Sequence, residues 1–307
     1  MSIEYRKGAV NAQMVVQSYE WGPAVPKVIV EFEDNVIVKT DGVEHVIKDV
    51  YHCDANGVKQ RYVTKYLSID MKVNTFFIKL LGASMGDASP FTYNIATELD
   101  LAPNMTFMVC ETEYGVQNAW TPFTKNLMEN YLVPETANWK KDSFTFTGIT
   151  LQRAAFTPKG AETDGVKNPL IIWLHGAGEG GVDIDTALLG NKVTALAKKG
   201  IQKYFTTRKQ KGAYVLAVQN PTMWMDKGDG SYNIDVEAGK RQTSIYDVAL
   251  FAAIKDYVAH NKDIDTSRIY LGGCSNGGYM TMNLMFEHGD YFSAFYPICE
   301  AYSDENK

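Results

Sequence analysis

One stretch of the chain decides its fold class: residues 268–278 read RIYLGGCSNGG, and residues 279–288 continue as YMTMNLMFEH. The apolar first part is typical of a β-strand, and the last part is typical of an α-helix. Between them, Gly273-Cys274-Ser275-Asn276-Gly277 matches G-x-S-x-G, the pattern of a sharp strand-to-helix turn, the nucleophile elbow. Only small residues fit two positions before and two positions after the central serine. Ser275 is therefore predicted to present its hydroxyl at the end of a sheet, and the alternative is an ordinary Gly-rich turn.

A second motif follows the apolar run Pro169-Leu170-Ile171-Ile172-Trp173-Leu174, which is typical of a strand buried on both faces. That run ends at His175-Gly176-Ala177-Gly178-Glu179-Gly180-Gly181. Acyl transfer needs two N–H groups directed at an oxyanion, one from such a loop and one from the residue after the nucleophile. We therefore predict that Ala177 and Asn276 form an oxyanion hole. The alternative is a phosphate-binding loop, but the G-x-x-x-x-G-K-[ST] and G-x-G-x-x-G patterns are absent.

Together with residues 265–271, DTSRIYL, the two motifs resemble the α/β-hydrolase esterases related to polyhydroxybutyrate depolymerases and feruloyl esterases. The resemblance spans roughly residues 143–300, and its motifs are specific for the superfamily but not for a substrate. It implies an α/β-hydrolase fold and a serine carboxylesterase with a Ser-Asp-His triad. No cofactor and no metal are expected. Some proteins of this type carry an N-terminal immunoglobulin-like domain.

The order of the catalytic residues departs from this pattern. In α/β-hydrolases the acid and then the histidine follow the nucleophile, yet His288 is the one histidine after Ser275. His288 ends the helix that starts at the elbow, and His260 ends the helix before it, so both are expected at the opposite end of the sheet. His175 is expected to anchor the glycine-rich loop by hydrogen bonds. We therefore expect the general base to come from elsewhere, and Glu300 is the one candidate acid in the chain.

The number of strands leads to the same expectation. Strands are predicted near residues 144–147, 150–156, 170–174, 214–218, 269–272 and 292–297, two fewer than in the sheet of the family that the chain resembles. The last of them would be an uncovered apolar edge, which is an aggregation hazard. We therefore expect a truncated or nicked chain, with the last strands missing or supplied by a separate C-terminal fragment.

The length of 307 residues predicts two domains, and 45% hydrophobic with 21% charged residues is ordinary for a globular protein. Short alternating segments predict an immunoglobulin-like β-sandwich over residues 1–125, followed by a linker over 126–142 and the α/β-hydrolase domain over 143–307. The net charge of −6 argues against a nucleic-acid surface. No apolar run reaches the length of a membrane span, and the N-terminus does not read as a signal peptide. We expect a secreted protein whose signal has been removed, and a cytoplasmic location stays open.

The four cysteines, Cys53, Cys110, Cys274 and Cys299, match neither a disulfide framework nor a zinc motif. Cys53 could pair with Cys110, and Cys274 with Cys299, because each pair falls in one predicted β region. Cys274 precedes the elbow serine, so its side chain is expected to point away from the site. We expect free thiols in preference to disulfides.

The segment after the strand at 214–218 begins where substrates bind in open α/β sheets. Met223 and Trp224 in this segment, with Tyr232 nearby, are predicted to form the wall of an acyl or aryl pocket. The alternative is that they are loop residues that plug the interface between the two domains. Neither the glycine-rich loop nor the elbow contains Arg or Lys, so uncharged acyl or aryl esters, free or in a polymer, are the expected substrates. An oligopeptidase and a non-catalytic binding protein with the same fold are the alternatives.

Overall fold

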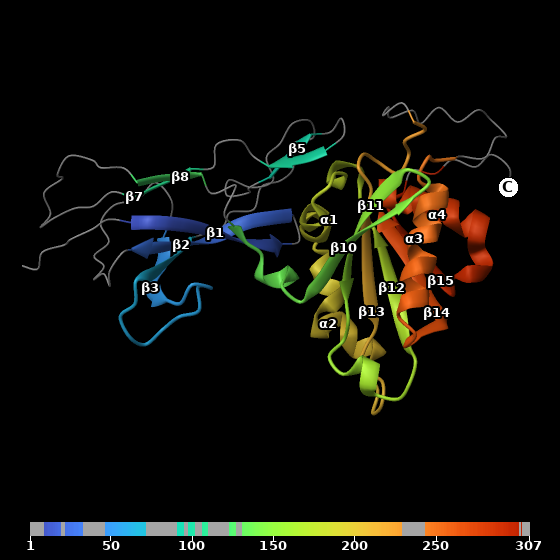
Figure 1. Cartoon of the computed structure of the whole chain (residues 1–307), viewed down its shortest axis with the longest axis horizontal. Helices are drawn as coiled ribbons and strands as arrows, with labels where there is room; N and C mark the ends of the chain where they lie inside the picture. Colours follow the sequence, from blue (N-terminus) through green and yellow to red (C-terminus); the bar gives the residue numbers. More distant parts are fainter. Residues whose placement is uncertain are drawn as a thin grey trace, which may run out of the picture. The chain divides into compact units, whose positions relative to one another are not determined.

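The computed structural model describes residues 9–19, 22–32, 47–71, 91–94, 98–101, 106–109, 123–126, 131–228, 243–300 and 302. The chain divides into two compact units, one built mainly from residues before 136 and the other mainly from residues 136–307. Each unit has a sheet of its own (Figure 1).

The N-terminal unit is built from strands. Its largest sheet has the order β3-β4-β2-β1-β9. β4 pairs antiparallel with both β2 and β3, while β1 and β9 are parallel. Val28, Ile29 and Val30 are buried in the middle of β2, as expected for a β-branched run. The strands of this sheet are β1 (Ala9–Tyr19), β2 (Gly22–Phe32), β3 (Ile47–Cys53), β4 (Tyr66–Met71) and β9 (Tyr131–Leu132).

Two further strand pairs occur in the N-terminal half of the chain. They are β5 (Phe91–Asn94) with β6 (Glu98–Leu101), and β7 (Thr106–Val109) with β8 (Phe123–Asn126). The prediction of an all-β N-terminal region is thus confirmed.

The C-terminal unit is organised around a mixed sheet with the order β10-β11-β13-β12-β14-β15. β10 and β11 form an antiparallel hairpin, β11 is antiparallel to β13, and the remaining pairs are parallel. All residues of β12 are buried, as its apolar sequence predicts. The strands are β10 (Trp139–Phe146), β11 (Ile149–Phe156), β12 (Asn168–Leu174), β13 (Tyr214–Gln219), β14 (Ile264–Cys274) and β15 (Ala294–Ile298).

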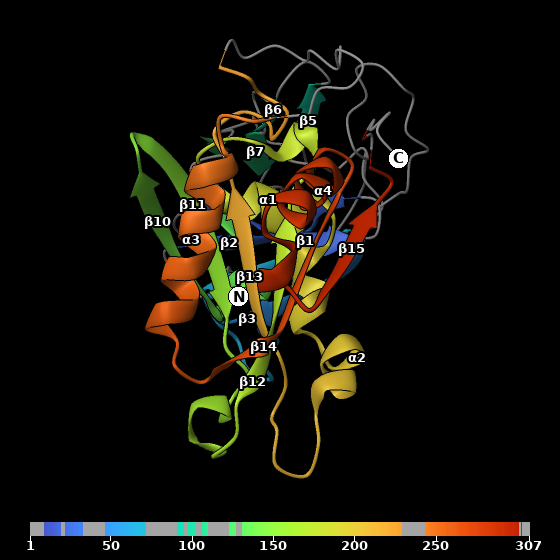
Figure 2. The same ribbon diagram turned by 90° about the vertical axis from the view of Figure 1, so that its right-hand side faces the viewer.

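Helices cover both faces of this sheet (Figures 1 and 2). α1 (Ile184–Gly190) and α2 (Lys199–Gln202) lie on one face, and α3 (Asp247–His260) and α4 (Asn276–His288) lie on the other. Along β12, Leu170, Ile172 and Leu174 pack in the core beneath α3 and α4, while Trp173 packs in the core beneath α1. The result is an α/β-hydrolase-like fold.

Short 3₁₀ helices connect these elements. They are η2 (Pro134–Thr136), η3 (Ala161–Thr163), η4 (Ala177–Glu179), η5 (Val193–Ala197), η6 (Lys203–Phe205) and η7 (Gly289–Tyr291). In the described part of the chain, no helix combines the length and the apolar character that a membrane span requires.

The start of the C-terminal sheet differs from the sequence prediction. Residues 126–142, predicted as a linker, contain β9, η2 and the beginning of β10. β10 starts at Trp139 because this indole is buried with Ala154 and Trp173 in the core beneath α1. The first strand of the sheet therefore begins several residues before the predicted position.

Candidate active site

Ser275 lies at the turn between β14 and α4, in the strained conformation that the G-x-S-x-G pattern predicts. Its backbone angles are φ 53° and ψ −112°, a region that residues other than glycine rarely adopt. A Cβ atom on Gly273 would lie 2.5 Å from the carbonyl oxygen of Leu174, and one on Gly277 would lie 2.1 Å from the same atom. Both positions require glycine because β12 approaches the turn closely. This agrees with the prediction that only small residues fit two positions before and two positions after the serine.

Hydrogen bonds to neighbouring elements hold this turn. The N–H of Ser275 donates to the carbonyl oxygen of Ile298 in β15 over 2.8 Å, and the N–H of Tyr279 donates to the carbonyl oxygen of Ser275 over 3.0 Å. Ser275 thus stands at the carboxyl end of β14 and at the N-terminus of α4. That position favours negative charge developing beside the serine.

The glycine-rich loop meets the elbow. A Cβ atom on Gly176 would lie 3.6 Å from the carbonyl oxygen of Cys274, the residue before the nucleophile. η4 begins at Ala177, and α4 begins at Asn276. Neither the N–H of Ala177 nor that of Asn276 is hydrogen-bonded to another described residue. Both predicted oxyanion donors therefore start helical turns beside the elbow with their hydrogens available.

Glu179 fixes the shape of the loop. Its carboxylate accepts a 2.7 Å hydrogen bond from the N–H of Gly176 and a 2.8 Å hydrogen bond from the side-chain amide of Asn191. The side chain is buried, and burial raises its pKa to about 8, although the two hydrogen bonds act in the opposite direction. Sequence reasoning did not assign Glu179 a role. Its position three residues after Gly176, where a capping box has its acidic residue, could have indicated that it holds the loop.

His175 anchors the loop, as predicted. Its Nε2 accepts a 3.2 Å hydrogen bond from the N–H of Asn220, so its Nδ1 carries the proton and donates to the carbonyl oxygen of Gly176 over 2.6 Å. The imidazole is completely buried, and burial lowers its pKa to about 4. Both ring nitrogens of the neutral His175 are thus engaged with backbone groups, which gives this residue a structural role.

Met223 and Trp224 are both completely buried. The indole N–H of Trp224 donates to the carbonyl oxygen of His175 over 3.0 Å, and the two rings lie 5.0 Å apart. The backbone N–H groups of Trp224 and Met225 donate to the side-chain oxygen of Asn276, over 2.5 and 3.3 Å. These contacts place Trp224 in the interior of the unit, where it joins the glycine-rich loop to the elbow and does not line an open pocket. Tyr232 lies outside the described residues.

Two other histidines of the C-terminal unit lie at the ends of helices, away from the elbow. His260 and His288 end α3 and α4, where His260 lies beside Asp256 and His288 stacks on Phe251. His52 belongs to β3, and His45 lies outside the described residues. None of the four described histidines is hydrogen-bonded to Ser275.

Glu300, the candidate acid, lies just beyond the carboxyl end of β15 and is exposed. A Cβ atom on Gly278 would lie 2.7 Å from its Cβ, so Glu300 packs beside the first turn of α4. Its carboxylate has no hydrogen bond to another described residue. The structure thus brings Glu300 near the elbow but does not join it to a base.

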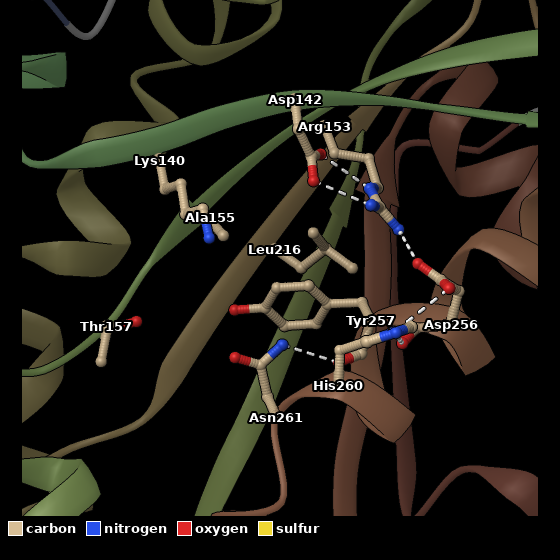
Figure 3. Close-up of a pocket in the computed structure, with 10 residues that line it drawn as sticks. All are labelled: Lys140, Asp142, Arg153, Ala155, Thr157, Leu216, Asp256, Tyr257, His260 and Asn261. Atoms are coloured by element: carbon tan, nitrogen blue, oxygen red, sulfur yellow. Dashed lines mark hydrogen bonds and ion pairs between the residues drawn. The ribbon is translucent and has the colours of Figure 1, made fainter.

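A pocket of about 370 Å³ lies elsewhere in this unit, beside β10, β11 and the second half of α3 (Figure 3). The guanidinium of Arg153 donates to both carboxylate oxygens of Asp142 and to Asp256. These charges are paired with one another, so we assign the cluster a structural role. No group of three metal-ligating side chains occurs among the residues that the structure describes.

The chain is similar to known proteins both in sequence and in structure. The family model described as the prolyl oligopeptidase family, Peptidase S9, matches residues 227–299. The solved structure of a thermostable esterase is similar with a TM-score of 0.67 and 20% identity, over 96% of this chain and 78% of that chain. A search of the curated proteins gave no match.

Two ferulic acid esterases resemble only part of the chain. One has a TM-score of 0.38 and 16% identity over 55% of this chain and 63% of its own. The other, a CE1 enzyme from the anaerobic fungus Anaeromyces mucronatus, has a TM-score of 0.35 and 18% identity over 54% of this chain and 59% of its own. The similarity to the thermostable esterase extends over nearly the whole chain and supports an α/β-hydrolase-like fold.

Proposed function

We propose that the protein is a serine hydrolase that cleaves carboxylic esters through an acyl-enzyme on Ser275. The observation that carries the proposal is the strained conformation of Ser275 next to two available N–H groups, those of Ala177 and Asn276. When the Ser275 Oγ attacks the ester carbonyl, the carbonyl oxygen becomes an oxyanion between these donors. They act without reorganisation, because η4 and α4 already hold them.

The proton of Ser275 needs an acceptor. A serine hydroxyl is a weak nucleophile without an adjacent base, and no described histidine is hydrogen-bonded to it. We infer that the base comes from outside the described residues and approaches from the side of β15. Glu300 lies on that side and is the candidate that would orient the base.

The proposed substrates are uncharged acyl or aryl esters, including esters in polymers such as polyhydroxybutyrate. Support comes from the absence of Lys and Arg in the sequences 175–181 and 273–277, where a charged substrate would need a partner. We also propose that the N-terminal strands form an immunoglobulin-like domain. An experimentally determined structure of the N-terminal unit would test this proposal.

A second candidate is an oligopeptidase, because the family model matched at residues 227–299 is that of prolyl oligopeptidases. The same nucleophile and oxyanion donors can attack a peptide bond. Comparing kcat/KM for p-nitrophenyl butyrate, methyl ferulate and a chromogenic proline-containing peptide separates the two. A higher value for the peptide would place the oligopeptidase first.

The test of the proposed function is Ser275→Ala, with Ser143→Ala as the matched control because Ser143 is an exposed serine in β10. Ester hydrolysis by the Ser275→Ala variant should fall by a factor on the order of 10⁴ or more, since the acyl-enzyme cannot form. Hydrolysis by Ser143→Ala should equal that of the unmodified protein. If a folded Ser275→Ala variant kept full activity, the proposal would fail.

A further inference from the structure

Two cysteines lie side by side next to the elbow. The Sγ atoms of Cys274 and Cys299 are 3.4 Å apart, and both residues are free thiols in this structure. Cys274 is the last residue of β14 and directly precedes Ser275, whereas Cys299 directly follows β15 and precedes Glu300. The two thiols therefore lie at the ends of the two strands that lead to the proposed nucleophile and the candidate acid.

The backbones around the pair are already held at a fixed spacing. Cys274 pairs with Ile298 in the parallel ladder, and the N–H of Ser275 donates to the carbonyl oxygen of Ile298 over 2.8 Å. A disulfide requires the two sulfurs to approach to about 2 Å. Cys299 is exposed, and with φ 41° it is the point at which the chain turns away from the strand. Cys299 lies beyond the last pair of the ladder, Cys274 with Ile298, so it does not belong to the paired strand.

We propose that Cys274 and Cys299 are an oxidation site that closes to a disulfide in the presence of a small-molecule disulfide such as oxidised glutathione. The thiolate of Cys299 first attacks one sulfur of the oxidant, which releases one glutathione and leaves a mixed disulfide. The thiolate of Cys274 then attacks the Cys299 sulfur and displaces the second glutathione. The two cysteine sulfurs lose two electrons, the glutathione sulfurs gain them, and the two thiol protons pass to the released glutathiones.

The order of these steps follows from exposure. Cys299 is the exposed member and meets the oxidant first, while Cys274 is partly covered. Burial raises the pKa of Cys274, so its thiolate is scarce at neutral pH. Attack by Cys274 is thus the slow step, and it depends on the proximity that the ladder provides.

The disulfide would link β15, the edge strand of the sheet, to its neighbour β14. β15 is the last strand in the described sheet order and pairs with β14. A Cys274–Cys299 disulfide closes the segment that contains α4 and β15 into a loop, which lowers the entropy of the unfolded chain. The oxidised protein is therefore more stable. Formation of the bond does not require that Ser275 be catalytic.

The sequence offers a direct assay on the full chain. Residues 269–306 contain no Lys or Arg, so trypsin releases one peptide, 269–307, with Cys274 and Cys299 as its cysteines. After treatment with oxidised glutathione and alkylation in denaturant, this peptide should carry no alkyl group and should lack two hydrogens. The reduced protein should give the doubly alkylated peptide. A doubly alkylated peptide after oxidation, or one that carries glutathione, would overturn the proposal.

Thermal unfolding gives an independent readout. Oxidation should raise the Tm of the unmodified protein by roughly 5–10 °C, from the stabilisation usual for a disulfide in a protein of this size. Cys299→Ser should abolish this rise, and the matched control Cys53→Ser, a buried cysteine of β3 in the other unit, should retain it. An equal rise in Cys299→Ser and in the unmodified protein would assign the effect to another site. Both assays are independent of ester hydrolysis, so a failed Ser275 test leaves them interpretable.

Discussion

The two sides of Ser275 are built differently. On the side of the glycine-rich loop, His175, Glu179 and Trp224 are buried and make hydrogen bonds that fix the loop. The backbone N–H of Trp224 also donates to the Asn276 side chain, which joins this side to the elbow. On the side of β15, Ile298 is 45% exposed, and Glu300 is exposed without a hydrogen bond to another described residue. The side proposed to bind the oxyanion is therefore fixed by buried contacts, whereas under the proposal the base that takes the Ser275 proton comes from outside the described residues.

This difference implies that substitutions on the two sides have unequal effects. A buried loop with paired polar groups cannot relax when one contact is lost, because each unpaired group stays in the interior. An exposed strand end can relax into solvent.

Gly277→Ala should destabilise the protein by about 3 kcal/mol or more, because overpacking against backbone cannot be relieved by a rotamer change. The added Cβ would lie 2.1 Å from the carbonyl oxygen of Leu174 and 2.6 Å from that of His175. Gly289→Ala is the matched control, since no atom lies within 4 Å of its Cβ position and its backbone is helical. Urea unfolding measures both. Equal stability of the two variants would mean that the elbow is less tightly packed than described.

Ala177→Pro should lower kcat for ester cleavage by roughly 10²- to 10³-fold, the usual loss for one oxyanion donor. Ala177 is the first residue of η4, and Gly176 before it is extended, with φ −75° and ψ 172°. Both features suit proline, so the substitution removes an N–H without breaking the turn. The Tm should stay close to that of the unmodified protein. Unchanged kcat in the folded variant would place the donor elsewhere.

Glu179 should make stability depend on pH. Its pKa is raised from 4.5 to about 8 in the folded protein, so between these values the folded chain keeps a proton that the unfolded chain has lost. Stability should therefore fall as pH rises from about 5 to 8. In Glu179→Gln this fall should be smaller, whereas the exposed Glu162→Gln should behave like the unmodified protein. Urea titrations at several pH values measure the slope, and identical slopes in all three proteins would remove Glu179 as its source.

Ile298→Thr should have the smallest effect. The side chain is 45% exposed at the end of β15, and threonine keeps the β-branched shape, so the loss should be within about 0.5 kcal/mol. Its carbonyl oxygen still accepts the hydrogen bond from Ser275. A loss comparable to that of Gly277→Ala would show that this side is as tightly organised as the other.

Much of this architecture was predictable from local sequence. Glycines at characteristic positions indicate the elbow and the glycine-rich loop, and an unbroken apolar run indicates β12. These features could be predicted without knowledge of contacts between distant residues. The anchoring role of His175 followed from its place in the loop. The all-β character of the N-terminal region followed from alternating segments.

Other parts depended on contacts between distant residues. The sequence predicts Trp224 as a pocket residue in a loop. In the structure its indole N–H donates to the carbonyl oxygen of His175, 49 positions away. Asn276 was assigned a backbone role, and its side chain also holds the Trp224 segment. The early start of β10 at Trp139 depends on partners in β11 and β12. Tertiary packing decides such features, and periodicity does not reveal it.

The central claim is that Ser275 is the nucleophile of a preformed oxyanion site, and the most direct measurement is the position of a covalent adduct. The protein is treated with a fluorophosphonate until its ester hydrolysis stops, and its tryptic peptides are sequenced by mass spectrometry. The account predicts one adduct, on Ser275 within peptide 269–307, and no adduct in Ser275→Ala. An adduct on a different residue that accompanies complete loss of activity, or complete loss of activity without any adduct, would contradict it.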